Sequence, residues 1–207
     1  MLPPDRLTAL PICIAGVGAV GRQVALQLAA AGARNICMYD HDYIEEVNLG
    51  PQGWKPRDLG RPKVYALQEE LADFHGTPVG FTAFQRRLPV ELAHPNEVLF
   101  CCVDGIETRG RIFAAHCGRA PLFLDSRVAA DVVHILSACD ADQYAYYPTT
   151  LFSDSDAFRG TCTTKMSIHI ANIAAGLLIQ QLSKWLRNKP LDRHVVFNFL
   201  AMESFCK

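Results

Sequence analysis

Residues Pro11 to Lys63 read PICIAGVGAVGRQVALQLAAAGARNICMYDHDYIEEVNLGPQGWKPRDLGRPK, and the class of fold can be predicted from them. The apolar run over 11–15 predicts a buried strand, and the alanine-rich run over 19–31 predicts a helix. Between them lie three closely spaced glycines, Gly16, Gly18 and Gly21. A glycine-rich turn that joins a strand to a helix is typical of a nucleotide-binding unit.

Each glycine of this turn has its own expected use. Gly16 allows the tight turn, Gly18 lets the backbone approach a phosphate, and Gly21 lets the helix lie close to the strand. The N–H groups at the start of the helix then face an anion. Asp40 ends the next apolar run and is placed to accept hydrogen bonds from ribose hydroxyls, while its charge disfavours the 2′-phosphate of NADP. The plainer alternatives are a structural turn and a surface acid.

Strands and helices alternate along the first part of the chain. Apolar runs predict further strands over 35–40, 79–84, 97–103 and 121–125, and other segments predict helices over 61–74, 88–93 and 107–118, with a long loop over 42–59. Such alternation indicates a parallel sheet with helices on both faces, in which ligands bind at the carboxyl ends of the strands.

The pattern changes after Asp125. A β-rich run over 128–138 follows with no helix before it, so we expect an antiparallel turn there. A polar and aromatic loop over 140–161, a helix over 167–185 and a last strand over 195–200 complete the chain.

We therefore predict an α/β fold, a Rossmann-like, mostly parallel sheet with helices on both faces and an antiparallel C-terminal extension. It forms one domain over 1–207, with a nucleotide-binding half over 1–126 and the antiparallel strands, crossover loop and C-terminal helix over 127–207.

Composition excludes several classes of protein. Half of the 207 residues are hydrophobic, and 20 Lys and Arg against 21 Asp and Glu give a net charge of −1, so we expect a sizeable core and no nucleic-acid partner. No apolar stretch reaches the roughly 18 residues of a membrane span, and no secretory signal is apparent, so we expect a cytoplasmic protein. The eight cysteines include no Cys-x-x-Cys pair, which favours reduced thiols over a four-cysteine zinc site.

Three further motifs extend the opening pattern: DHDYIEEVNLGPQ, DLGRPK and CCVDGIETR. Together with the glycine turn, they resemble the ThiF/MoeB family of ubiquitin-activating-enzyme-like adenylyltransferases. Members carry an Asp-x-Asp after the second strand, an Asn-Leu-x-Arg-Gln turn, a Gly-x-Pro-Lys helix start and a Cys-x-Asp-Asn after the fourth strand. The resemblance covers nearly the whole chain and is specific for the family rather than for one member; the chain is similar to compact bacterial members.

The resemblance implies a role for each matching residue. Asp40 would hold the ATP ribose, Asn48 would contact the triphosphate or its metal, and Lys63 would bind phosphate oxygens and stabilise the developing charge. Asp42 and Gln52 would be further nucleotide-binding residues. Asp104 would hold Mg²⁺, a hard cation that prefers oxygen ligands. The alternatives are a helix-start surface lysine for Lys63 and a helix N-cap for Asp104. The implied activity is ATP-dependent adenylation of the C-terminal carboxylate of a small ubiquitin-like or sulfur-carrier protein, by a homodimer.

The chain departs from the family pattern at several positions. Pro51 stands where the family has an arginine, and Gly105 stands where it has an asparagine. Arg57, in the same loop, is our candidate for supplying the missing guanidinium. The family segment that supplies an arginine to the partner subunit is short here, with only Arg6 upstream of the glycines, and the family's two Cys-x-x-Cys zinc pairs are absent.

Cys162 is a second candidate catalytic residue. It precedes a predicted helix and lies near Lys165, and both features favour a thiolate. It resembles the family cysteine that forms a thioester in some members, and the alternative is a structural thiol. Arg127 either faces the tail of the carrier protein or pairs with Asp131.

Two histidines do not fit a catalytic role. We expect His134 and His169 to be core or surface residues rather than bases.

Two other classes of function are alternatives to adenylation. A catalytically degenerate, dimerising scaffold would keep the nucleotide pocket without turnover. An NAD-dependent oxidoreductase would use the glycine turn and Asp40 but would give no function to Asn48, Lys63 and Asp104.

Overall fold

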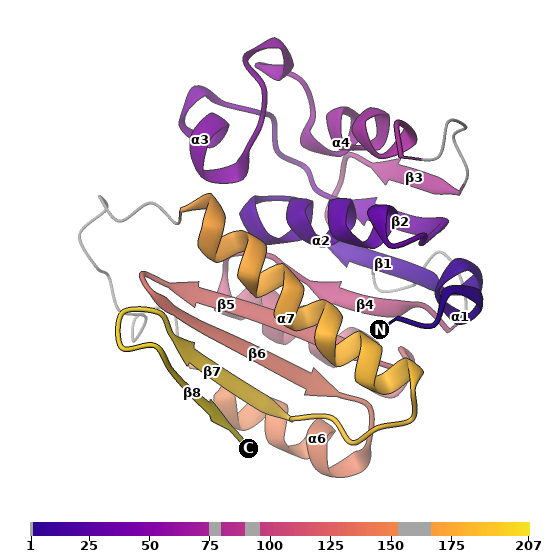
Figure 1. The fold of residues 1–207 in the computed structure, drawn as a ribbon, viewed down its shortest axis with the longest axis vertical. Coiled ribbons are helices and arrows are strands. Elements are labelled where there is room, and N and C mark those ends of the chain that lie inside the picture. Colours follow the sequence, from indigo (N-terminus) through magenta and orange to yellow (C-terminus); the bar gives the residue numbers. More distant parts are fainter. Residues whose placement is uncertain (1, 75–79, 90–95, 153–166) are drawn as a thin grey trace.

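One eight-stranded sheet runs through the chain in the computed structural model, which describes residues 2–74, 80–89, 96–152 and 167–207 (Figure 1). The strands are β1 (Pro11–Ala15), β2 (Asn35–Tyr39), β3 (Phe81–Phe84), β4 (Val98–Cys101), β5 (Phe123–Ala129), β6 (Val132–Ala138), β7 (His194–Asn198) and β8 (Glu203–Cys206). Their order in the sheet is β3-β2-β1-β4-β5-β6-β7-β8.

The first five strands form a parallel half. β1 pairs with both β2 and β4, β2 pairs with β3, and β4 pairs with β5, all in parallel. Chain order reverses at β1, so the loops that follow β1 and β4 leave the sheet side by side at a switch point, where open α/β sheets bind ligands. The predicted α/β fold is confirmed.

The last four strands form an antiparallel half. β5, β6, β7 and β8 pair in succession, each antiparallel to the one before. The predicted antiparallel turn exists but comes later than the sequence suggested, because Ser126 to Ala129 continue the ladder with β6. The chain turns at Ala130, whose backbone φ is 51°, and Asp131.

Helices cover both faces of the sheet, as predicted. They are α1 (Pro4–Ala9), α2 (Ala19–Ala30), α3 (Leu49–Gln52), α4 (Lys63–Ala72), α5 (Ile106–His116), α6 (Ala141–Tyr146) and α7 (Ile168–Leu186), with 3-10 turns η1 (Glu46–Asn48), η2 (Pro56–Asp58) and η3 (Tyr147–Thr150). Alternate strand residues point to opposite faces, so Ile12 and Ile14 join a core with α2, α4 and α7, while Cys13 and Ala15 join a second core with α5 and η3.

Helix α7 lies against α2, the helix that follows the glycine turn (Figure 1). Val24 and Leu28 of α2 and Ala174 and Leu178 of α7 are fully buried in the same core. The Gln27 amide also donates a hydrogen bond of 3.0 Å to the carbonyl of Asn172 in α7. The C-terminal part of the chain therefore supports the helix that begins at the predicted phosphate site.

Several short elements differ from the sequence prediction. α1 and β8 were not expected, and α6 and η3 occupy the first part of a segment predicted as loop. Asp140 caps α6, since its carboxylate accepts a 2.8 Å hydrogen bond from the backbone N–H of Gln143. Of the predicted helix over 88–93, Leu88 and Pro89 are not helical, and the remainder lies outside the described residues.

The structure bears on two expectations drawn from composition, within the residues that it describes. None of the helices that the structure describes is long and apolar enough to cross a membrane. The seven cysteines within the described ranges are all free thiols. Burial raises the pKa of the Cys37 thiol to about 11 and that of Cys102 to about 12, so these two behave as core side chains.

Candidate functional site

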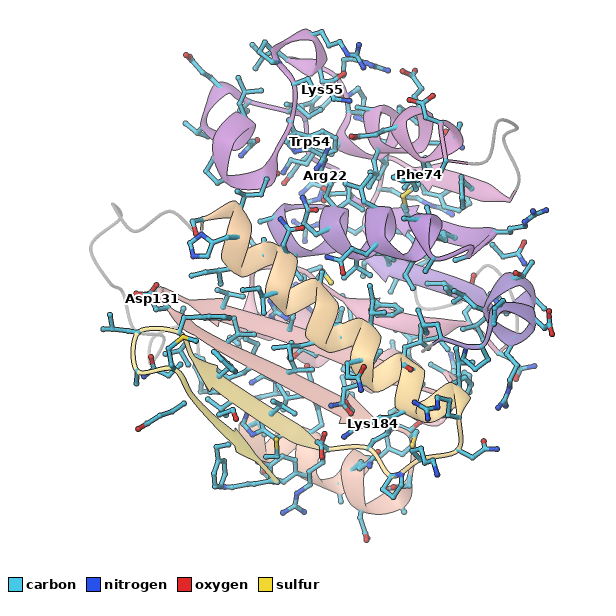
Figure 2. All side chains as sticks on the ribbon, viewed as in Figure 1. Arg22, Trp54, Lys55, Phe74, Asp131 and Lys184 are labelled. Atoms are coloured by element: carbon cyan, nitrogen blue, oxygen red, sulfur yellow. The ribbon has the colours of Figure 1, made fainter. Side chains whose placement is uncertain are left out.

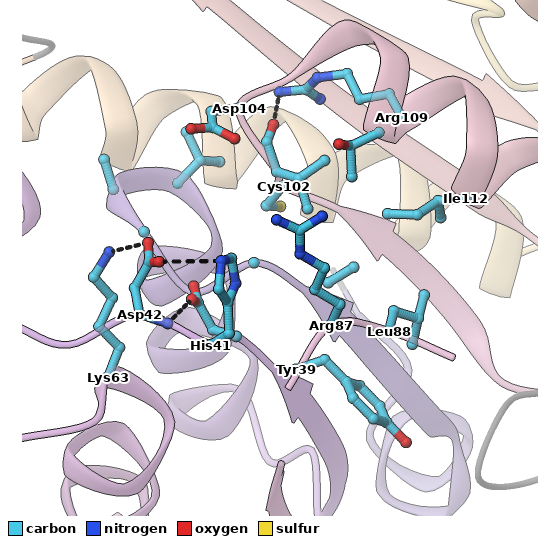
Figure 3. A pocket seen from close by; sticks show the side chains of 18 of the residues that line it. Tyr39, His41, Asp42, Lys63, Arg87, Leu88, Cys102, Asp104, Arg109 and Ile112 are labelled. Carbon is cyan, nitrogen blue, oxygen red and sulfur yellow. Dashed lines mark hydrogen bonds and ion pairs between the residues drawn. The ribbon is translucent and has the colours of Figure 1, made fainter. Parts of the chain in front are cut away.

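A cavity of about 720 Å³ opens at the carboxyl ends of β1, β2 and β4. Most of the sequence-predicted site residues line it: Gly16, Gly18, Asp40, Asp42, Asn48, Gln52, Lys63 and Asp104. They come from segments far apart in the chain, and the sheet's switch point brings them together (Figure 3).

Each of the three glycines is suited to its position for a different structural reason. Gly16 has a φ of +84°, and a Cβ there would lie 2.8 Å from the carbonyl oxygen of Cys102, where β4 ends. At Gly21 a Cβ would lie 1.9 Å from the Gly16 oxygen, so this glycine lets α2 approach the turn. At Gly18 a Cβ would meet nothing closer than Gln52 Nε2, at 4.0 Å. The space above Gly18 therefore belongs to the cavity.

Asp40 connects β2 to the glycine turn. It is buried, and its two carboxylate oxygens accept backbone hydrogen bonds from Val17, at 2.8 Å, and Asp42, at 2.9 Å. Each oxygen keeps a second lone-pair position. The carboxylate is thus held in one orientation at the cavity wall and retains the capacity to accept further hydrogen bonds.

Lys63 begins α4 and points into the cavity toward Asp42 (Figure 3). Its Nζ donates to Asp42 Oδ2 at 2.9 Å, and the lysine side chain is 7% exposed against 50% for the aspartate. Burial of this kind does not fit the surface-lysine alternative. Two of its three ammonium hydrogens remain available to a ligand.

The loop after β2 is fixed against α2 and α4. Asn48 forms a capping box with Glu45 at η1. The Gln52 side-chain oxygen accepts a 3.0 Å hydrogen bond from the Trp54 indole, and the Arg22 guanidinium lies 4.7 Å from the centre of the Trp54 ring (Figure 2). These contacts leave the amide nitrogen of Gln52 facing the space above the glycine turn.

Asp104 follows β4 on the opposite side of the cavity mouth. It is exposed, and its Oδ1 accepts a 2.9 Å hydrogen bond from the Gly105 backbone. Gly105 itself occupies the N-cap position of α5, and no side chain caps that helix. The N-cap alternative for Asp104 is therefore not what the structure shows.

The residues present fit a nucleoside triphosphate and a hard divalent cation. The turn at Gly18 offers an open cradle at a helix N-terminus, and Lys63 supplies a positive charge. An oxygen donor for a cation comes from Asp104. Among the described residues, Asp40, His41 and Asp42 also have ligand atoms within 4.8 Å of one another, but Lys63 already occupies Asp42.

A buried ionic network borders the cavity and was not predicted. Arg109 in α5 forms an ion pair with Asp125, which is fully buried, and also donates to the carbonyls of Val103 and Ser126. Although burial opposes its charge, the Asp125 carboxylate holds the pKa of Arg109 above its ordinary value. Tyr147 donates to the same carboxylate at 2.9 Å.

Arg127 joins this network. Its Nε donates to Asp125 at 2.9 Å, and its two terminal nitrogens donate to Thr150 at 2.7 and 3.0 Å. The alternative pairing with Asp131 is wrong, because Asp131 lies at the exposed turn between β5 and β6 (Figure 2). With these donors engaged, Arg127 is a structural residue in this conformation.

Two other residues considered in the sequence analysis, Arg57 and Arg6, lie outside the cavity. Arg57, in η2, is exposed and is not among the residues that line the cavity. Arg6, in α1, donates to the Leu186 carbonyl at the end of α7. Cys162 lies outside the described residues.

His134 and His169, which we expected to be core or surface residues, do not line the cavity. His134 Nδ1 lies 2.9 Å from His194 Nε2, and His194 Nδ1 lies 3.0 Å from the Tyr146 hydroxyl. Burial, then His134 and Arg127, lower the pKa of His194 to about 4. His169 is exposed beside Ser167.

Sequence reasoning missed several residues on the far side of the cavity, including Arg87, Leu88, Arg111, Ile112 and His116. Arg87 and Leu88 follow β3, so the rule that ligands bind at carboxyl ends of parallel strands was the signal that could have found them.

Comparisons with known proteins identify the family of the chain. The profile of the ThiF family matches residues 4–205. Ubiquitin-like modifier-activating enzyme 5 is 25% identical in Gallus gallus, with 97% of this chain and 56% of the relative covered, and 24% identical in Arabidopsis thaliana, with 89% and 49% covered. The chain thus spans about half the length of these relatives.

Solved structures show the same fold. Those of PaaA and of E. coli MccB with ATP superpose with TM-scores of 0.77 and 0.76 at 16% identity, covering 99% of this chain and 65% of each of those chains. Because the family profile spans nearly the whole sequence, the chain belongs to the ThiF family.

Proposed function

We propose that this chain binds ATP with Mg²⁺ and adenylates the C-terminal carboxylate of a small ubiquitin-like or sulfur-carrier protein. The observation that carries the proposal is the convergence of the glycine turn, Asp40, Lys63 and Asp104 on one cavity. Relatives support it: one is named a ubiquitin-like modifier-activating enzyme, and MccB has been solved with ATP and with MccA.

The reaction needs positioning and charge neutralisation more than covalent help from the protein. A carboxylate oxygen of the substrate attacks the α-phosphorus, the bond to the oxygen bridging to the β-phosphate breaks, and pyrophosphate leaves with the electron pair. The N–H groups at the start of α2 and Lys63 would hold phosphate oxygens, and Asp40 would orient the ribose. Mg²⁺ held by Asp104 would neutralise phosphate charge.

Carrier-dependent exchange of labelled pyrophosphate into ATP tests the proposal. The assay uses a panel of purified small ubiquitin-fold proteins, each with a free C-terminal carboxylate. We expect exchange with one of them and a loss of about 100-fold or more for Asp104→Ala and Lys63→Ala. Asp131→Asn, at an exposed turn, is the matched control and retains exchange. Undiminished exchange in Asp104→Ala would refute the proposed role of that residue.

Thioester formation on Cys162 is a separate step of the proposal. The Cys162 thiolate would attack the acyl-adenylate carbonyl and release AMP, giving a carrier–enzyme conjugate. A band that is sensitive to reductant on a denaturing gel, present in the wild type and absent in Cys162→Ser, would support it. Exchange with no such band would limit the chemistry to adenylation.

A nucleotide-binding scaffold without turnover is the second candidate, and Pro51 favours it. This proline lines the cavity where the family has an arginine, while Arg57 lies outside it. ATP binding measured by calorimetry, with no pyrophosphate exchange for any carrier, would favour the scaffold.

We do not propose an oxidoreductase, because Asn48, Lys63 and Asp104 all line the cavity and would have no function in one. Light scattering on a sizing column tests the expected homodimer.

A further inference from the structure

The predicted positions of ribose and phosphates determine where the base of a nucleotide would lie. Phosphates belong at the glycine turn and Lys63, and the ribose belongs at Asp40. A nucleotide held in this way continues past Asp40 to the far end of the cavity. That end is lined by the segment after β3, which carries Arg87, and by α5.

Arg87 differs from the other basic groups of the cavity. Lys63 pairs with Asp42, Arg109 pairs with Asp125, and Arg111 lies 3.4 Å from the Thr108 hydroxyl. Within the described parts of the chain, Arg87 has no hydrogen bond or ion pair to a protein group. Although the Arg87 side chain is exposed, its guanidinium points into the cavity, toward Cys102 in the view of Figure 3.

Apolar side chains lie on one side of this guanidinium. Leu88 and Ile112 both line the cavity there (Figure 3). A planar guanidinium that faces aliphatic side chains leaves a slot suited to a flat aromatic ring, which gains from contact on one side and from cation–π stacking on the other.

The two sides of the slot are held together. The His116 side chain of α5 lies 3.1 Å from the carbonyl oxygen of Pro89, two residues after Arg87. Since a carbonyl can only accept, Nε2 carries the hydrogen. Burial lowers the pKa of His116. The segment that carries Arg87 is therefore tied to the helix opposite.

We propose that the guanidinium of Arg87 stacks on the heterocyclic base of the bound nucleotide and so distinguishes a nucleoside triphosphate from inorganic triphosphate. The inference rests on the proposed nucleotide site and adds a specificity residue to it. Arg87 acts on binding of the base and not on the phosphates.

Calorimetric titrations with Mg-ATP and with Mg-tripolyphosphate test this. We expect Arg87→Ala to weaken ATP binding about 5- to 30-fold and to leave tripolyphosphate binding within about twofold. Arg87→Lys, which keeps the charge and loses the plane, gives an intermediate loss for ATP. Arg86→Ala is the matched control: Arg86 lies over the Tyr39 and Phe84 rings and does not line the cavity, so ATP binding stays within about twofold.

Three outcomes would overturn the inference. Equal losses for ATP and tripolyphosphate would make Arg87 a phosphate contact. Unchanged ATP affinity in Arg87→Ala, with the wild type binding ATP, would remove Arg87 from the site but leave the proposed function intact. A wild-type protein that binds no ATP would overturn both this inference and the proposed function. The circular dichroism spectrum of Arg87→Ala should match the wild type, since this exposed side chain has no partner in the described structure.

Discussion

Replacing Asp125 with asparagine should destabilise the protein severely. The side chain is fully buried and balances the charges of Arg109 and Arg127 while accepting from Tyr147. Asparagine keeps the volume but removes the negative charge, so the two guanidinium groups of Arg109 and Arg127 lose their counter-ion. Breaking a buried ion pair by removing one partner costs about 3–5 kcal/mol.

That cost is a large part of the total free energy of unfolding, which is about 5–15 kcal/mol for a domain. For a chain of this size, each kcal/mol lowers the melting temperature by roughly 2–4 °C, so Asp125→Asn should melt about 6–20 °C lower. Tyr147→Phe removes a single hydrogen bond to the same carboxylate and should cost about 1 kcal/mol.

Urea unfolding followed by circular dichroism, with thermal melts beside it, measures both variants. Asp131→Asn is the matched control, because it makes the same change at an exposed turn, and its stability should stay within about 0.5 kcal/mol of the wild type. If Asp125→Asn lost less than about 1 kcal/mol, the network would not be the structural centre described above. A loss in Tyr147→Phe equal to that in Asp125→Asn would contradict the central role of the charge.

Other outcomes can be checked in parallel. Gly16→Ala should fail to fold or lose several kcal/mol of unfolding free energy, because Gly16 has a φ of +84° and a Cβ there would lie 2.8 Å from a backbone oxygen. Gly18→Ala should melt at the wild-type temperature, since its Cβ enters only the cavity. The same calorimetric titration should show that Gly18→Ala has lost ATP affinity. Stability should fall as pH drops from about 6.5 to about 4, because the folded-state pKa of His194 is lowered to about 4 and the unfolded state binds the proton first. Partial exposure limits this loss to about 1–2 kcal/mol, and His194→Gln, followed by urea unfolding across that range, should flatten the profile. In the native state a thiol reagent should modify Cys117 and Cys206, which are exposed, far faster than Cys101, which is buried with a raised pKa, and equal rates would contradict the burial.

The parallel half of the fold could be predicted because its signals are local. One strand-turn-helix-strand unit contains the apolar run before Gly16, the glycine spacing and the carboxylate of Asp40. The structure shows the close approaches and the hydrogen bond that explain the glycines and Asp40. Asp104 reaches the same cavity because it follows β4, which ends at the switch point of the sheet. Lys63 is brought there because its backbone N–H donates to the carbonyl of Asp42, just after β2.

The remainder depends on partners distant in sequence. Nothing near Arg109 indicates that Asp125 would neutralise it, because the pairing arises from β4 and β5 lying side by side. Arg57 looked suitable only because it shares a loop with Asn48, and that loop turns its guanidinium outward. Short elements such as α1 and β8 have too few residues for a periodic pattern and are stabilised by what they pack against.

The packing of α7 on α2 has a consequence for synthesis of the chain. Roughly 140 residues separate the two helices, and at ~5–20 residues per second the ribosome needs on the order of ten seconds to make them. During that interval the nascent chain presents the apolar side of α2, with Val24 and Leu28 uncovered. The helix of the glycine turn is thus among the first parts translated and among the last to be covered, so a stalled or truncated product would expose this surface to chaperones and to aggregation.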